Sequence, residues 1–325
     1  RAGRRGGGPH YPVPLALASS GPCCAVRDQV GSSLELWIPI TIVAAFLQNL
    51  RSMLQKRATG DLSINGASYT RFLFALPFVW LYLAWLATRG PLPDLSLEFL
   101  AFCLVGGGAQ ILGTAFLVAS FTHDNFAVGT AFSKTEAVQT ALFGLLILGD
   151  TLTGTAFSGI LVSFFGVIIL SNPGRMSQLL KGNRALVLGV ASGAGFAVAA
   201  VSYRAAALSL PEGDFLTRSG STLAVTVTLQ TLMMGGYLLM REPGELPRVI
   251  RSWRTSIWVG LLGGVASACW FSAMTLVNAG LVRALGQVEL LFTFAASIWF
   301  FGERVTSKEI LGAVLVILGL WLLLL

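Results

Sequence analysis

The stretch GTAFSKTEAVQTALFGLLILGDTLTGTAFSGILVSFFGVIIL at residues 129–170 has a counterpart, VRALGQVELLFTFAASIWFFGERVTSKEILGAVLVILGLWLL, at residues 282–323. The two align without a gap at an offset of 153 residues. Matched positions are Ala131 with Ala284, Glu136 with Glu289, Gly149 with Gly302, Asp150 with Glu303, Thr153 with Thr306, Gly159 with Gly312 and Gly166 with Gly319. Such matches at glycine and acidic positions are not expected by chance, so we interpret the chain as two related halves.

The composition indicates a protein whose outer solvent is lipid. Hydrophobic residues make up 54% of the 325 residues and charged residues only 11%, whereas soluble domains carry about 25% charged residues. A single soluble core also stops growing at roughly 250–300 residues. We therefore predict an integral membrane protein, with the plasma (bacterial inner) membrane as its expected location.

Ten segments approach the roughly 20 apolar residues that a helix needs to cross a bilayer. They span residues 36–55, 67–88, 97–121, 126–148, 154–171, 184–207, 215–240, 255–278, 281–301 and 307–325. Each half then holds five helices, and because five is odd the second half starts on the opposite side of the membrane. The predicted fold is an all-α membrane protein of ten transmembrane helices, arranged as two inverted five-helix repeats, as in many secondary transporters.

The predicted boundaries divide the chain into three parts. Residues 1–33 are rich in Gly, Pro and Ser and hold no apolar run long enough to span a membrane. We expect them to form a disordered tail, or to lie outside the functional protein. Residues 34–172 form the first five-helix repeat and residues 183–325 the second.

Glu136 and Glu289 are the two acidic residues near the middle of a predicted helix, and each is the repeat mate of the other. A charge at the bilayer centre costs from about 2.5 kcal/mol upwards, so it persists where it faces a partner or a polar interior. One interpretation is an interhelical hydrogen bond that ties the bundle together. The other is a cavity-lining pair that meets a substrate amine or a coupling proton.

Further polar residues in the apolar segments complete the candidate substrate and coupling-ion cavity. In a regular helix Lys134 points about 200° away from Glu136, so we expect it to face neighbouring protein, whereas Gln139 shares the face of Glu136. Gln287 is the repeat mate of Lys134, and Arg283 lies near the start of its helix. The candidate cavity residues are Glu136, Glu289, Gln139, Lys134, Gln287, Gln110 and Trp270.

Other polar residues have a structural interpretation. Asp150 and Glu303 precede the next helix, where carboxylates complement the N-terminal dipole, and Thr306 to Glu309 has the capping-box spacing. Gly106–Gly108 favours tight helix packing, with a helix break near a binding site as the alternative. Six residues toward helix ends are expected to be interfacial anchors: Gln48, Arg51, Arg71, Tyr203, Arg204 and Arg218.

Several classes of function are excluded by what the sequence lacks. The net charge of +7 comes from an arginine-containing tail and short connections, a distribution typical of membrane proteins, and no basic and aromatic platform for nucleic acid is present. The four cysteines have no metal spacing, and His123-Asp124 has no second histidine in reach. We find no nucleophile–base set, so we expect neither an enzyme nor a metal or other cofactor.

The repeat resembles the EamA-type repeat of the drug/metabolite transporter superfamily. The resemblance rests on Glu136-Ala137, the run Leu148–Thr153, Gly159 and Gly166, and on a second copy with Glu289-Leu290, the run Phe301–Thr306, Gly312 and Gly319. It implies a ten-helix carrier with a central cavity, commonly an exporter of amino acids, metabolites or drugs. Proline often follows the glutamate in this family, whereas Ala137 and Leu290 stand here.

We therefore predict a secondary transporter in contact with membrane lipid, an efflux carrier of a small metabolite, amino acid or drug. It is expected to work by alternating access, with protons as candidate coupling ions. Because Lys134 is an unusual cation for a membrane segment, an anionic solute of the sugar-phosphate type is an alternative. A non-transporting sensor or scaffold is a second alternative.

The orientation in the membrane stays open, because family members are usually drawn with both termini inside, whereas the positive-inside rule places them outside. That placement rests on Lys56, Arg57, Arg175, Lys181, Arg184, Arg241, Arg248, Arg251 and Arg254.

Overall fold

The computed structural model describes residues 22–58, 62–121, 126–171, 184–301 and 306–325. Over these ranges the ordered secondary structure is helical, and no strand is present. The helices are α1 (Pro22–Ala58), α2 (Ile64–Leu73), α3 (Leu76–Ala87), α4 (Leu97–Phe121), α5 (Phe126–Ser133), α6 (Glu136–Phe143), the π-helical turn η1 (Gly144–Leu148), α7 (Gly154–Ser171), α9 (Arg184–Ser209), α10 (Phe215–Arg241), α11 (Glu245–Arg251), α12 (Trp253–Leu276), α13 (Ala279–Leu285), α14 (Val288–Phe301) and α15 (Ser307–Leu323).

Six helical stretches in the described ranges are long and apolar enough to cross a membrane. They are Leu36–Gln55, Ile64–Ala87, Leu97–Ser120, Arg184–Ser209, Phe215–Arg241 and Trp253–Leu276, and each coincides with a predicted segment. Gly154–Leu170 is a shorter apolar helix. The predicted segments 126–148 and 281–301 are helical but interrupted.

The interruptions fall at repeat-related positions. The first separates α5 from α6 at Lys134 and Thr135, and the second separates α13 from α14 at Gly286 and Gln287. At the first, the Thr135 N–H donates to the Phe132 carbonyl at 3.1 Å, a three-residue spacing in place of the α-helical four. The second contains the same spacing, from the Gln287 N–H to the Ala284 carbonyl at 3.1 Å. Both breaks therefore tighten the backbone just ahead of Glu136 and Glu289, the two repeat-matched glutamates.

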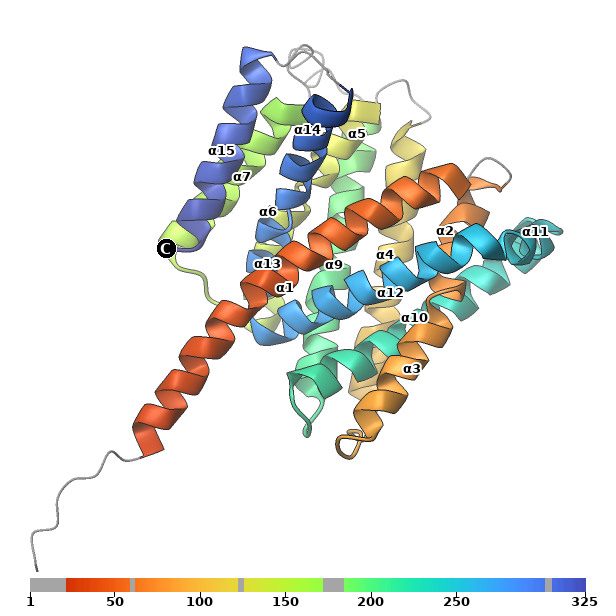
Figure 1. Cartoon of the computed structure of the whole chain (residues 1–325), viewed down its shortest axis with the longest axis horizontal. Helices are drawn as coiled ribbons and strands as arrows, with labels where there is room; N and C mark the ends of the chain where they lie inside the picture. Colours follow the sequence, from red (N-terminus) through yellow and green to blue (C-terminus); the bar gives the residue numbers. More distant parts are fainter. Residues whose placement is uncertain (1–21, 59–61, 122–125, 172–183, 302–305) are drawn as a thin grey trace, which may run out of the picture.

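The bundle is built from pairs of helices taken from opposite halves of the sequence. α4 packs along α9, α1 along α12 and α7 along α15 (Figure 1). A Cβ on Gly159 would lie 2.6 Å from the Gly319 carbonyl oxygen, and one on Gly166 would lie 2.9 Å from the Gly312 carbonyl oxygen. Small residues allow this close backbone approach, which is how helices associate in lipid. The paired positions run in opposite directions, so α7 and α15 are antiparallel.

The glycines at Gly106–Gly108 do not break a helix, because α4 is continuous from Leu97 to Phe121. A Cβ at Gly106 would lie 2.6 Å from the ring of Tyr203, whereas a Cβ at Gly108 would meet nothing within 4 Å. Close packing therefore accounts for the first glycine, and the third faces open space.

The sequence prediction is confirmed near the C-terminal end of the chain and differs from the structure near the N-terminal end. The capping box is confirmed: Thr306 Oγ1 accepts from the Glu309 N–H at 3.3 Å, and the Thr306 N–H donates to Glu309 Oε2 at 2.7 Å. At the other end α1 begins at Pro22, within the stretch expected to be a tail, and its first part projects beyond the bundle (Figure 1). Residues 1–21, Glu303 and the His123-Asp124 pair lie outside the described residues.

Candidate functional site

A small polar cavity lies where the two helix breaks meet α1 and α12. Its volume is about 30 Å³, room for about two water molecules. The lining residues are Gln48, Lys134, Glu136, Ala137, Trp270, Arg283, Gly286, Gln287 and Glu289. In this conformation the cavity is therefore too small to hold an organic solute.

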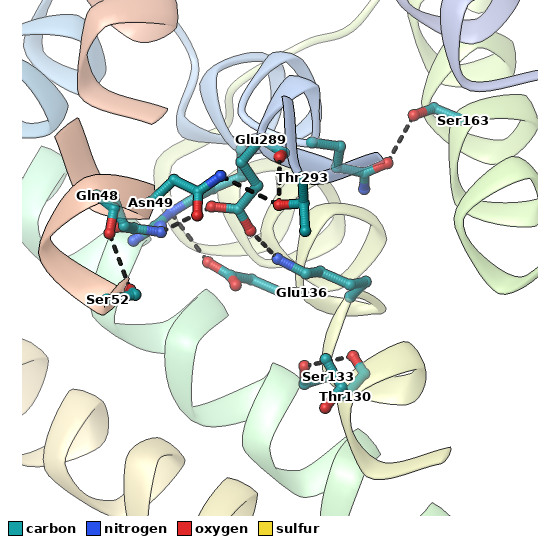
Figure 2. Close-up of polar contacts among 12 residues, drawn as sticks. Gln48, Asn49, Ser52, Thr130, Ser133, Glu136, Ser163, Glu289 and Thr293 are labelled. Atoms are coloured by element: carbon teal, nitrogen blue, oxygen red, sulfur yellow. Dashed lines mark hydrogen bonds and ion pairs between the residues drawn. The ribbon is translucent and has the colours of Figure 1, made fainter. Parts of the chain in front are cut away.

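Each glutamate in the cavity is paired with a cation from the other half of the chain. The ammonium of Lys134 contacts the carboxylate of Glu289 directly (Figure 2). Arg283 Nε lies 3.0 Å from Glu136 Oε1, close enough for an ion pair, although its N–H is not aligned for a hydrogen bond. All four side chains are at most 21% exposed. Because buried ions are stable only when paired, these contacts hold the two halves together at the cavity.

Gln48 of α1 connects the ion pairs to α12. Its Nε2 donates to Glu289 Oε2 at 3.0 Å (Figure 2). Its Oε1 accepts from the Trp270 indole N–H at 3.0 Å. The guanidinium of Arg283 lies 5.0 Å from the centre of the Trp270 ring, within cation–π range. A Cβ at Gly286 would lie 2.4 Å from that ring, so a larger residue would displace the indole.

The helix break explains why Lys134 reaches this cavity. We expected Lys134 to point away from Glu136, as it would in a continuous helix, and this expectation is wrong. The helix ends at Ser133 and restarts at Glu136, which rotates Lys134 toward the cavity that Glu136 also lines. A broken helix thus brings both charges of one half to a single site.

The other candidate residues divide between the cavity and its surroundings. Gln287 lines the cavity and accepts a hydrogen bond from Ser163 Oγ at 2.6 Å, and Trp270 lines it as well. Gln139 is not among the lining residues: its amide donates to Thr135 Oγ1 at 3.0 Å and contacts the Val190 carbonyl. Gln110 lines a separate small cavity. The structure therefore brings together five of the seven candidates.

Sequence reasoning missed Gln48 and Arg283 as members of this site. Both are polar side chains inside predicted membrane segments, which was the available signal. The sequence predicts an interfacial anchor at Gln48, toward the end of its helix, and predicts no role for Arg283. The partner of each residue comes from the other half of the chain, so its position follows from the tertiary fold.

The anchor interpretation is also wrong for Arg204 and Tyr203. Arg204 binds Asp150 in a bidentate ion pair, at 2.9 and 3.2 Å, and its Nη1 donates to the carbonyls of Met274 and Val277. Tyr203 is 2% exposed and donates to Gln110 Oε1 at 2.9 Å. Both side chains therefore belong to the protein interior.

Asp150 consequently has a role other than helix capping. At the start of α7 the hydroxyl of Thr153 accepts from the Ala156 N–H at 3.1 Å, so threonine is the capping residue there. The carboxylate of Asp150 instead joins the turn after η1 to α9 through Arg204.

Comparison with known proteins identifies the class of protein that carries this site. The model of the EamA-like transporter family matches twice, over residues 35–172 and 184–325. The chain belongs to this family, and it is a multi-pass membrane transporter of the drug/metabolite transporter superfamily. The resemblance seen in the repeat is thus confirmed.

A solved structure has the same fold. Its title reads "Crystal structure of protein", and the superposition has a TM-score of 0.64 at 16% sequence identity. The match covers 89% of this chain and 96% of that chain. At this identity the likeness concerns the fold alone.

Proposed function

We propose that the chain is a secondary transporter that exports a small organic solute by alternating access, using ten membrane crossings in two inverted five-helix halves. The observation that carries this proposal is the reciprocal pairing at the cavity, in which Lys134 binds Glu289 and Arg283 binds Glu136. Each contact joins one half to the other. A relative movement of the halves must therefore break or exchange both contacts.

Two further features support inverted halves. The close contacts of Gly159 with Gly319 and of Gly166 with Gly312 interchange when each residue is replaced by its repeat mate, as a two-fold axis requires. The helix breaks recur at repeat-related positions. Discontinuous helices at the interface of inverted repeats are typical of secondary transporter binding sites.

The charges of the cavity suggest how binding could be coupled to movement. Glu136 and Glu289 balance Lys134 and Arg283, so the closed cavity is electrically neutral as a set. A proton or a solute amine that neutralises either carboxylate removes the partner of one cation. The released contact then allows the halves to separate on one side, which is the coupling role that we assign to both glutamates.

Flux measurements test this function in two stages. A metabolite-export screen on overexpressing cells identifies a transported solute, whose flux is then measured with purified protein in liposomes at several pH values. Glu136→Gln and Glu289→Gln should lower flux roughly tenfold or more, a change of about 1.4 kcal/mol, because each variant removes the charge whose neutralisation we propose to release the halves. The pH response of the flux should disappear with them.

Glu98→Gln is the matched control, since Glu98 is an exposed residue in the first turn of α4. Parental flux and pH response in both cavity variants would contradict the coupling role. Absence of flux for every solute, together with a partner protein that co-purifies, would instead favour a sensor or scaffold.

A further inference from the structure

A second polar cavity holds two arginines that the proposed coupling site does not use. Arg51 of α1 and Arg71 of α2 both line it, together with Gln110 and Gln230. Its volume is about 30 Å³. Gln110 and Gln230 lie near the middle of α4 and α10, so the two guanidinium groups reach toward the centre of the membrane. Interfacial anchors would extend toward the headgroups, so our first interpretation of both arginines is wrong.

Neither arginine has an acidic partner within the described ranges. Lys134, Arg283 and Arg204 each form an ion pair with a carboxylate, whereas no ion pair involves Arg51 or Arg71 there. Arg71 Nη2 donates to the hydroxyl of Thr114 at 3.2 Å, and its guanidinium lies 4.4 Å from the centre of the Phe72 ring. Arg51 Nη2 lies 3.5 Å from the hydroxyl of Ser52. The Nε atoms of both arginines are buried and have no hydrogen-bond partner. Donors of two buried charges are therefore left unsatisfied.

The charges of the neighbouring ion pairs indicate what kind of group would satisfy the free donors of Arg51 and Arg71. Within the described ranges the carboxylates of Glu136, Glu289 and Asp150 are each matched by a cation, whereas Arg51 and Arg71 bring two positive charges to the second cavity without an ion pair. Arginine stays protonated inside proteins, and an unpaired charge in the membrane interior is costly. An anion that accepts from both guanidinium groups would offset this cost, with hydrogen bonds stronger than those to neutral acceptors.

A larger, mostly apolar cavity adjoins this small one. Arg71 and Phe72 line both this cavity and the smaller one. Its volume is about 520 Å³, within the range of sites for small organic ligands. Its walls include Ile111, Leu112, Met233 and Met234. The combination fits a molecule whose apolar body occupies the larger cavity while its anionic group reaches the arginines.

We propose that Arg51 and Arg71 bind the anionic group of the transported solute, a carboxylate or phosphate carried on a compact apolar body. This inference rests on the proposed transport function, because it names the chemical class of the solute. It assigns substrate recognition to α1, α2, α4 and α10, and it leaves Glu136 and Glu289 to coupling.

Binding to the purified full chain in nanodiscs of zwitterionic lipid tests the inference without measuring transport. Four probes share one ring and differ in their head group: phenylacetate, phenyl phosphate, 2-phenylethylamine and 2-phenylethanol. Calorimetric titration at fixed ionic strength should show that at least one anion binds about tenfold or more tightly than the amine and the alcohol. Tighter binding of the amine, or no binding of either anion, would overturn the proposal.

Variants locate the site. Arg51→Gln and Arg71→Gln should each remove the preference for anions, whereas Arg89→Gln, at an exposed arginine stacked on Trp85, should keep it. Parental binding by Arg71→Gln would contradict the assignment. Glu303→Gln should leave binding unchanged. If Glu303→Gln lost as much anion binding as Arg51→Gln, Arg51 would form an ion pair with Glu303 instead, and its assignment to solute binding would be overturned.

Two glycine variants test the location of the site by steric blocking if the arginine variants do not fold. Gly108→Leu places a side chain in the larger cavity, where a Cβ meets nothing within 4 Å, and it should weaken anion binding. Gly236→Leu is the matched control, because its Cβ is equally unobstructed but it does not line the cavity. Equal binding by both variants would contradict the location. Anion binding without flux in liposomes would contradict the transport function and leave the site intact.

Discussion

Lys134→Met is expected to lower the free energy of unfolding by about 3–5 kcal/mol, because it leaves the buried carboxylate of Glu289 without its cation. Gln48 still donates one hydrogen bond to that carboxylate, but an amide carries no charge. Methionine is close to lysine in length, so the loss reflects charge more than volume. Equilibrium unfolding in mixed micelles, followed by tryptophan fluorescence, measures the change.

The double variant Lys134→Met with Glu289→Gln separates the ion pair from general damage to the fold. Removing both charges leaves no buried ion unpaired at that contact, so the double variant should recover a large part of the lost stability. If the double variant were as unstable as the sum of the two single variants, the contact between Lys134 and Glu289 would contribute nothing, and the reciprocal pairing would lose one of its two members.

Arg204→Met is the second substitution with a large expected effect, a loss of about 3 kcal/mol or more of unfolding free energy. It removes the bidentate partner of Asp150 and the donor to the carbonyls of Met274 and Val277 at the end of α12. Asp150 is 15% exposed, so water can replace the guanidinium only in part. The same unfolding measurement applies.

Arg248→Met is the matched control for this loss. Arg248 also forms an ion pair, with the buried carboxylate of Glu245 at 2.8 Å, but the Arg248 side chain itself is 54% exposed. Water reaches this exposed guanidinium, and the Ser63 N–H still donates to Glu245 Oε1 at 2.6 Å, so the control should lose less stability than Arg204→Met, about 1 kcal/mol. Similar losses in the two variants would mean that burial does not set the value of the Asp150 contact.

Much of the architecture followed from periodicity and from one repeat. Long apolar runs have few alternatives to helices in lipid, which is why six of the predicted segments coincide with long apolar helices in the described ranges. Alignment of the halves also singled out Glu136 and Glu289 before any geometry was available. The repeat offset predicted equivalent depth for the two residues, and the structure places both in one cavity.

The partners of these residues depended on features that periodicity does not encode. A regular helix would have turned Lys134 away, and only the break after Ser133 turns it inward. Arg283, Gln48 and Arg204 meet partners 54 residues or more away along the chain. Burial of an arginine near a helix end likewise depends on which neighbouring helix covers it, so the anchor interpretation failed there.

Accessibility of a single cysteine tests alternating access at this cavity most directly. Ala137 lines the cavity, and Ala141 lies one turn further along α6 against Gly280; each is 2% exposed. In a protein whose four native cysteines are replaced by alanine, Ala137→Cys should react with a membrane-impermeant thiol reagent added on either side of the membrane, whereas Ala141→Cys should not react. Failure of Ala137→Cys to react from one of the two sides would contradict the account.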